Sequence, residues 1–340
     1  MPSYPYGLKG IPGFKRIRSQ KAPSNSAEFP TIKKGLGGLP KRRQAPPEWV
    51  LTVDITAGGQ DWSVDISSGT GIYIKIDWDD GTVEYFTTTG EKNHVYSTPG
   101  RYFPRISGKF SGSGNIRFST NSGNAARLKA TSVVPFIAGL ANFRETFAYT
   151  SVTSIPVDLF RYNPAVSTDG FMSTFAFCAL LKSIPVDLFR YNTLNISFWQ
   201  TFAYCHNITE VPADLFKYNT AATSFRNTFR SNTTLTTIPA DLFRYNTNCL
   251  DFNGTFYDTP GLKSRADIFF RSGEESTRFL NKSPSFVKFL LRLSSNSEIG
   301  TAPELWNCNY GTGTPAKTMC FNGHSTSTVD NYASIPAEWL

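Results

Sequence analysis

Apolar residues in the second half of the chain recur with a long, regular period. Four prolines, each preceded by Ile or Val, stand 29, 27 and 27 residues apart, at Pro156, Pro185, Pro212 and Pro239. Asp-Leu-Phe begins two residues after each proline, so that residues 154–163 return three more times with few changes. A fixed period of this length is typical of stacked repeats, in which every unit buries its apolar side chains against its neighbours. We therefore predict a solenoid of units of about 27 residues.

Pairs of phenylalanines four residues apart run in phase with these prolines. The pairs are Phe143/Phe147, Phe171/Phe175, Phe198/Phe202, Phe225/Phe229 and Phe252/Phe256. A spacing of four places both rings on one face of a short helix, so we predict a helical segment and a phenylalanine core in each unit. Proline followed by an acid predicts a second short helix start.

Polar positions repeat as regularly as the apolar ones. The acids are Asp158, Asp187, Asp214 and Asp241, the cations are Arg161, Arg190, Lys217 and Arg244, and the amides are Asn163, Asn192, Asn219 and Asn246. We expect the cations to alternate with the acids and the amides to satisfy backbone groups at turns between units. A ligand-binding acidic stripe is the alternative. Cys178 and Cys205 hold equivalent positions and are predicted to be small buried residues.

The repeat decays after residue 246, as a terminal capping region does. Residues 265–269 are a worn copy, and residues 301–306 and 334–339 are further copies in which Trp replaces Phe. Residues 286–293 are apolar over a helix-length run and are predicted to seal the stack. We assign the solenoid to residues 128–262 and the degenerate repeats with their cap to residues 263–340.

Residues 48–127 show the alternation of apolar and polar residues that is typical of strands. This pattern predicts a small antiparallel β-sandwich. Asp80-Gly81 lies between two such runs and predicts a tight hairpin turn. The complete prediction is a mixed α/β, multidomain chain, with an extended arm at residues 1–47, the sandwich, the solenoid and the C-terminal cap.

Motifs within the predicted sandwich resemble a known module. The segment I-D-W-D-D-G-T at residues 76–82, His94-Val-Tyr96 and Gly100-Arg-Tyr102 look like the polycystic-kidney-disease type of immunoglobulin-like domain. This resemblance implies an immunoglobulin-like sandwich.

Three acids in this segment, Asp77, Asp79 and Asp80, suggest calcium. No spaced Glu completes a calcium loop, so turn chemistry is favoured over a metal site.

The first 47 residues differ from the rest in composition. Ten Lys and Arg stand against the single acid Glu28, which gives +9, whereas the whole chain carries +8 and residues 48–340 therefore carry −1. Eight prolines and six glycines accompany few large apolar residues. Such a segment cannot form a core by itself.

A duplicated motif in this arm, at residues 7–12 and 35–40, suggests two extended anchors that dock on equivalent surfaces of a partner protein. The candidate anchoring residues are Lys9, Ile11, Pro12, Lys15, Arg16, Arg18, Lys33, Lys34, Leu39, Pro40, Lys41, Arg42 and Arg43. Nucleic acid is the competing partner because cations neutralise phosphates, and a merely solvated tail is the third interpretation. The neutral remainder of the chain and the lack of a nucleic-acid-binding motif favour protein, and no apolar stretch reaches membrane-spanning length.

Catalytic chemistry has little support in the sequence. The three histidines, His94, His206 and His324, lie in different contexts, and no metal-ligand spacing, phosphate loop or nucleophile elbow is present. We expect no enzyme activity, no cofactor and no metal. Five cysteines do not form a disulfide scaffold, and pairing of Cys308 with Cys320 is left open.

The repeats themselves also resemble a family. F-x-x-T-F-x-x-C followed by L-x-S-I-P-x-D-L-F is similar to the leucine-rich-repeat-like surface repeats of the BspA and mycoplasma-lipoprotein type. T-A-P-E-L-W and N-Y-A-S-I-P-A-E-W are similar to the C-termini of phage tail or fibre proteins with such repeats. The resemblance implies a leucine-rich-repeat-like solenoid that attaches to a host surface.

The start of the chain departs from that family, because it carries a basic arm and has no apolar signal core. We therefore expect a bacteriophage virion protein, assembled in the host cytoplasm and present in several copies or as a homo-oligomer. Its partners are other virion proteins through the arm and a host glycan or protein through the solenoid. A capsid or collar decoration protein and a bacterial cell-surface adhesin are the alternatives.

Overall fold

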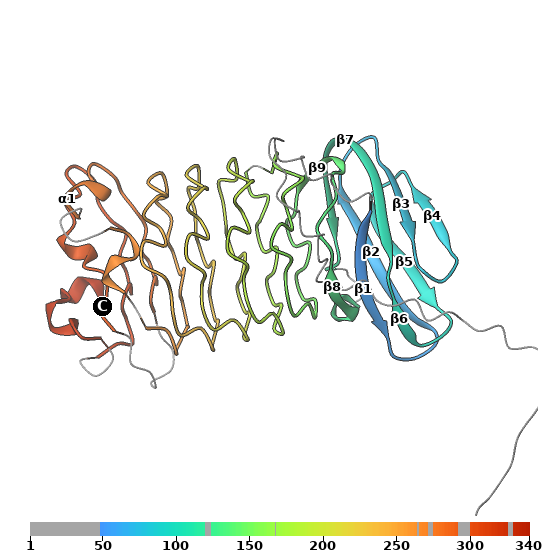
Figure 1. Cartoon of the computed structure of the whole chain (residues 1–340). Coiled ribbons are helices and arrows are strands. Elements are labelled where there is room, and N and C mark those ends of the chain that lie inside the picture. The colour runs from blue at the N-terminus through green and yellow to red at the C-terminus, as the bar shows by residue number, and fades with distance from the viewer. Residues whose placement is uncertain are drawn as a thin grey trace, which may run out of the picture. The chain divides into compact units, whose positions relative to one another are not determined.

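The computed structural model of this chain describes residues 48–119, 124–166, 168–263, 265–270, 275–291, 300–325 and 329–340 (Figure 1). Residues Arg43–Leu340 form one compact unit. Within this unit, a β-sheet is followed by a stack of coils. The predicted arm lies outside the described residues.

Nine strands build the sheet. They are β1 (Trp49–Ile55), β2 (Gln60–Ser68), β3 (Tyr73–Asp77), β4 (Val83–Phe86), β5 (Gly90–Tyr96), β6 (Gly100–Tyr102), β7 (Arg105–Arg117), β8 (Leu128–Thr131) and β9 (Ala138–Asn142). The main path runs β4-β3-β7-β1-β6, with β2 and β9 joined to β7, β5 to β2 and β8 to β1. All pairings are antiparallel except β7 with β9.

The strand prediction for residues 48–127 is correct, but the immunoglobulin-like sandwich is not confirmed. A sandwich requires two separate sheets that face each other. Here the 13-residue strand β7 pairs with β1, β2, β3 and β9 and links them into one sheet. The predicted Asp-Gly hairpin is confirmed, since β3 and β4 pair in register and Gly81 turns the chain with a φ of +96°. Alternate inward side chains of β1, including Trp49 and Leu51, are fully buried.

Coils of about the predicted length stack after β9 (Figure 1). Single parallel bridges join equivalent residues of successive coils, as in the series Ser197, Ser224, Asp251, Ser285 and Ala316. Main-chain hydrogen bonds also join successive coils, as from the N–H of Phe198 to the carbonyl of Ser224 and from the N–H of Phe225 to the carbonyl of Asp251. Each coil therefore pairs with the next over short stretches and not through long strands.

The predicted mixed α/β fold with leucine-rich-repeat-like units is wrong. Helix in the described residues amounts to one four-residue α-helix and five three-residue 3-10 helices. These are α1 (Glu275–Arg278), η1 (Ala125–Arg127), η2 (Ala266–Ile268), η3 (Leu305–Asn307), η4 (Tyr332–Ser334) and η5 (Ala337–Trp339). The chain is mostly antiparallel sheet and turns.

The physical reason lies in the backbone of the F-x-x-T-F segments. The N–H of Phe175 donates to the carbonyl of Thr201 in the next coil at 2.9 Å, where a helix would direct it to residue 171. Ser173, between the two phenylalanines, has a φ of +53°, which no right-handed helix contains. Asp187, at the second predicted helix start, has a φ of +61°. Both predicted helices are therefore tight turns.

The phenylalanine core is confirmed. All ten predicted rings are fully buried, and equivalent rings of successive coils stack. The second rings of the pairs lie nearly parallel with their centroids 5.3 to 5.8 Å apart, from Phe147 through Phe175, Phe202 and Phe229 to Phe256. Such offset stacking adds to the apolar burial that stabilises the stack.

Buried asparagines join the coils, as predicted. The side-chain amide of Asn192 donates to the carbonyl of Asn163, Asn219 to Asn192, and Asn246 to Asn219, at 2.9 to 3.0 Å. Arg278 then donates to the carbonyl of Asn246 at 3.0 Å and ends the series. Burial lowers the pKa of Arg278 to about 10.

The sheet supplies the first level of the stack. Trp49 of β1 packs edge-on against Phe118 and Phe147 with centroids 5.2 and 5.9 Å apart. The N–H of Phe118, just after β7, donates to the carbonyl of Thr146 in the first coil at 2.8 Å. Sheet and coils therefore share one continuous core.

The predicted sealing helix at residues 286–293 is wrong within its described part, residues 286–291. Phe286 and Leu290 donate their N–H groups to the carbonyls of Ala316 and Cys320 at 2.7 and 2.9 Å, as the earlier coils do. The segment is therefore one more level of the stack. The next level ends at Phe321, whose N–H donates to the carbonyl of Trp339 in η5.

Candidate functional site

An aromatic strip runs along one side of the first coils. It consists of Tyr149, Phe177 and Tyr204, which occupy equivalent positions and stack with centroids 4.5 and 4.4 Å apart and planes 6° apart. Tyr149 is 56% exposed and Phe177 is 38% exposed. These rings are outside the core, although large aromatic side chains usually gain stability by burial.

The backbone does not require aromatic residues at these positions. Tyr149, Phe177 and Tyr204 have φ values of +60° or +61°, where bulky side chains are unfavourable. Ser231 and Asp258 take the equivalent positions of the next two coils with a similar φ. Small or polar residues can therefore make this turn. Formation of the turn does not explain the aromatic side chains of the strip, which suggests that they have a function.

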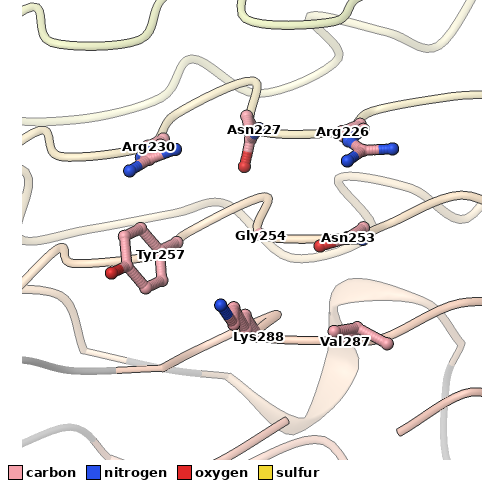
Figure 2. Close-up of a pocket in the computed structure, with 8 residues that line it drawn as sticks. All are labelled: Arg226, Asn227, Arg230, Asn253, Gly254, Tyr257, Val287 and Lys288. Atoms are coloured by element: carbon pink, nitrogen blue, oxygen red, sulfur yellow. The ribbon is translucent and has the colours of Figure 1, made fainter. Parts of the chain in front are cut away.

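A cationic cavity lies beside the end of the aromatic strip. It has a volume of about 230 Å³ and is lined by Arg226, Asn227, Arg230, Asn253, Gly254, Tyr257, Val287 and Lys288. Figure 2 shows these residues on three successive coils. The guanidinium of Arg230 lies 5.7 Å from the ring of Tyr204 and 4.6 Å from that of Tyr257, so it connects the strip with the cavity.

The repeated cations elsewhere on the coils are neutralised, as predicted. Each of Arg161, Arg190, Lys217 and Arg244 pairs with the aspartate three residues before it at 3.1 to 3.5 Å. Three of them also lie over the tyrosine of the following coil at 5.1 to 5.7 Å. This face is satisfied within the protein, which favours the structural interpretation over an acidic binding stripe.

The predicted anchoring residues all fall in the arm and lie outside the described residues. The structure therefore does not test whether these residues lie together. Anchoring through residues 1–47 stays a prediction.

The acids of the first hairpin serve the turn, as favoured from the sequence. Asp77 accepts a hydrogen bond from the N–H of Asp79, and Asp80 accepts one from the N–H of Thr82, both at 3.0 Å. Asp80 also contacts His94 at 2.7 Å, and the pKa of Asp80 lies below its ordinary value because these hydrogen bonds outweigh its burial. Over the described ranges, no group of three or more His, Cys, Asp or Glu side chains is arranged to hold a metal ion.

The five cysteines are buried and not disulfide-bonded. Cys178 and Cys205 donate from Sγ to the carbonyls of Phe147 and Phe175, and burial raises the pKa of Cys178 to about 12. Such thiols are protonated at neutral pH and unreactive. Cys308 and Cys320, whose pairing the sequence left open, are not joined to each other by a disulfide.

Sequence reasoning missed both the aromatic strip and the cationic cavity. A signal was present, since Tyr149, Phe177 and Tyr204 each stand two residues after the second phenylalanine of a pair. A helical interpretation of that segment hid the outward direction of these side chains. Arg230 and Lys288 come from coils that differ from the repeat at those positions, so no periodicity marked them.

Comparison with protein-family models, with curated proteins and with solved structures finds no match to this chain. No helix in the part of the chain that the structure describes is long and apolar enough to cross a membrane. The function is therefore inferred from the residues and surfaces described above.

Proposed function

We propose that this chain is a non-enzymatic structural protein of a bacteriophage particle that attaches to the host surface. Residues 1–47 anchor it to other virion proteins, and the coils present the aromatic strip to the host. The aromatic strip carries this proposal. Tyr149 and Phe177 are exposed and Tyr204 is half-buried. All three are bulky residues at a positive φ, whereas the next two coils make the same turn with Ser231 and Asp258.

Exposed aromatic side chains support attachment for a general reason. Contiguous exposed apolar surface on a folded protein marks an interaction site, and Tyr and Arg are enriched among the residues that dominate binding energy. Several copies on one particle would multiply a weak contact by avidity.

The sequence supports the virion setting. The resemblance of residues 301–306 and 331–339 to the ends of phage tail or fibre proteins favours a particle component. The charge of +9 in the first 47 residues, against −1 in residues 48–340, separates a basic anchor from a nearly neutral display region.

The decisive experiment compares particle incorporation with adsorption. Phage that carry the full chain, a chain lacking residues 2–47, or the triple variant Tyr149→Ser, Phe177→Ser, Tyr204→Ser are scored for the protein on purified particles and for binding to host cells. Loss of the arm is expected to remove the protein from particles. The triple variant is expected to remain on particles that adsorb at least about tenfold less well.

A matched control uses exposed aromatics of the sheet. Tyr73 and Tyr85 are 48% and 57% exposed, and their conversion to Ser should leave adsorption unchanged. Normal adsorption of particles with the triple variant would contradict the attachment role. Particles that adsorb normally without the protein but lose stability would indicate a decoration protein, and export to the bacterial surface would indicate an adhesin.

A further inference from the structure

The cations of the cavity are not neutralised by carboxylates in the part of the chain that the structure describes. Arg226, Arg230 and Lys288 line the cavity, and no carboxylate forms an ion pair with any of them among the described residues. Two acids adjoin the lining residues in sequence. Asp251 accepts hydrogen bonds from the hydroxyl of Ser224 at 2.9 Å and the N–H of Asn253 at 3.1 Å, and Asp258, next to Tyr257, forms no ion pair with these cations among the described residues. Three cations without counter-ions stand out on a region that carries −1 overall.

Arg230 is partly ordered by its surroundings. Its guanidinium lies between the rings of Tyr204 and Tyr257, and its Nε is buried without a hydrogen-bond partner within the described ranges. A buried donor without an acceptor carries a free-energy cost that a bound acceptor would remove. The planar guanidinium suits carboxylate, sulfate and phosphate oxygens.

One of the residues that line the cavity is a glycine. Gly254 has a φ of +61°, and a Cβ atom there would lie 2.2 Å from Oδ1 of Asn227. Figure 2 shows Asn227, Gly254 and Lys288 on successive coils, with the Lys288 side chain on the side of Tyr257. The ammonium of Lys288 is 6.0 Å from the Tyr257 ring, so this tyrosine has cations from two coils beside it.

We propose that this cavity binds the acidic groups of a negatively charged cell-surface polysaccharide, whose chain continues along the aromatic strip. The proposal rests on the attachment function proposed above and specifies its ligand. Arg230 and Lys288 hold carboxylate, sulfate or phosphate groups. The strip supplies ring edges and the hydroxyls of Tyr149 and Tyr204.

A repeating polymer fits this surface better than nucleic acid does. Phe177 has a ring stacked on each face, and Tyr204 lies between Phe177 and Arg230, so neither ring has a face open to an unstacked base, which single-strand binding requires. Duplex binding draws on many phosphate contacts, whereas residues 48–340 carry −1 in total. A regular polysaccharide instead presents an acidic group and hydroxyls at a constant interval along a surface that itself repeats.

Binding of defined polymers to the purified full-length protein and to a chain lacking residues 2–47 tests the proposal, because the basic arm can attract any polyanion and only binding that remains without it counts. Polygalacturonate presents carboxylates, dextran sulfate presents sulfates, dextran is neutral, and single-stranded DNA is the nucleic-acid alternative. We expect at least one acidic polysaccharide to bind at physiological ionic strength, with dextran and DNA at least about tenfold weaker.

Charge-matched variants locate the site. Arg230→Gln with Lys288→Gln is expected to lower affinity for the acidic polysaccharide at least about tenfold, since each cation contributes charge-assisted hydrogen bonds. The control Arg190→Gln with Lys217→Gln removes the same amount of charge from two cations that lie outside the cavity and are paired with aspartates. It should change affinity less than about twofold. Lys288→Gln alone, at an exposed position, keeps the test valid if the double variant folds poorly.

Equal effects of the two double variants would overturn the proposal, because they would indicate attraction by net charge alone. Preference for DNA, or no binding of either acidic polysaccharide, would also overturn it. Adsorption of particles to cells separates this result from the function. If adsorption depends on the strip but is unchanged by Arg230→Gln with Lys288→Gln, the ligand assignment is wrong and the attachment function stands. If the protein binds the polymer but particles do not need it for adsorption, the ligand assignment stands and the attachment function is wrong.

Discussion

Buried threonines show how single side chains hold successive coils in register. The hydroxyl of Thr201, in the F-x-x-T-F turn, lies 2.9 Å from the carbonyls of Phe171 in the preceding coil and Phe198 in its own coil. Thr174 and Thr228 make the equivalent contact with the preceding coil at 2.9 Å. Each hydroxyl satisfies a carbonyl that no water reaches, so the residue is required for its polarity as well as its size.

Thr201→Val tests that requirement. The change keeps the shape but leaves a buried carbonyl short of a donor, so we expect a loss of about 1 to 3 kcal/mol in the free energy of unfolding. Urea unfolding followed by circular dichroism measures it. Thr193→Val, at an exposed position in the same coil region, should stay within about 0.5 kcal/mol. Equal losses in both variants would show that the hydroxyl contact is unimportant.

The buried asparagines offer a second test at the residue scale, because their role depends on donated protons. The amide of Asn219 donates to the carbonyls of Phe189 and Asn192 at 3.1 and 3.0 Å. Asn219→Asp puts a buried carboxylate against two carbonyl oxygens, and we expect it to cost at least about 3 kcal/mol at neutral pH.

Acid should partly rescue this variant. Burial raises the pKa of the introduced carboxyl, and the protonated form can donate one hydrogen bond, so the deficit relative to the original chain should shrink as the pH falls toward about 4. Asn248→Asp is the control, since Asn248 makes its hydrogen bond at an exposed site, and its cost should stay below about 1 kcal/mol. A deficit for Asn219→Asp that does not change with pH would contradict the donor role.

At the scale of elements, the strands and the repeat period followed from the sequence and the conformation of the coils did not. Alternation of side chains predicted the strands of residues 48–127, and strict recurrence of Phe147 and its equivalents predicted the stacked core. A spacing of four fits both a helical turn and two consecutive tight turns. Hydrogen bonds to the neighbouring coil decide between them, and a sequence pattern within one coil contains no information on those bonds.

The site was less predictable than the fold. Its cations come from positions where the repeat is broken, and no carboxylate pairs with them among the described residues. Arg190 and Arg230 look alike in the sequence, yet only Arg190 has an aspartate three residues before it with which it pairs.

The pairing of β1 with β6 makes a prediction about pH. Asp54 and Arg101 face each other across these strands with two hydrogen bonds of 2.6 and 2.9 Å, which lower the pKa of Asp54 below its ordinary 3.8. The folded chain therefore keeps this charge at pH values where the unfolded chain takes up a proton. The stabilising contribution is complete above about pH 4 and is lost as the pH falls through the folded pKa.

Asp54→Asn should accordingly lower the free energy of unfolding by up to about 1 kcal/mol at neutral pH, a small value because solvent screens the exposed Arg101. The difference should shrink as the pH falls below 3.8 and vanish once Asp54 is protonated in the folded chain, as measured by urea unfolding over a pH series. Arg101→Gln should show the same pH dependence. A difference that persists in acid would exclude this ion pair as its cause.

At the scale of the whole molecule, every coil presents nearly the same edge to its neighbours. Removing residues 199–225 joins Phe198 to Arg226 and restores an F-x-x-T-F segment. We expect this 27-residue deletion to fold and to shorten the stack by about 4.8 Å, the spacing of paired strands. Cryo-electron microscopy or X-ray scattering measures the change.

The control deletion removes residues 199–211 only and joins Phe198 to Pro212, which places an incompatible half-coil in the stack. It should abolish cooperative unfolding, because neighbouring coils stabilise one another and cannot pair out of register. Failure of the whole-coil deletion to fold, or folding of the half-coil deletion, would show that register between coils matters less than the hydrogen bonds suggest.

Equivalent coils also have a consequence for the gene. A gene that loses or gains the codons of one whole unit, such as the 27 residues 199–225, keeps its reading frame. Each such event yields a chain that still stacks, with its outer end one level nearer or farther from the sheet. Length then changes in whole steps of one coil, and a longer or shorter stack needs no new fold.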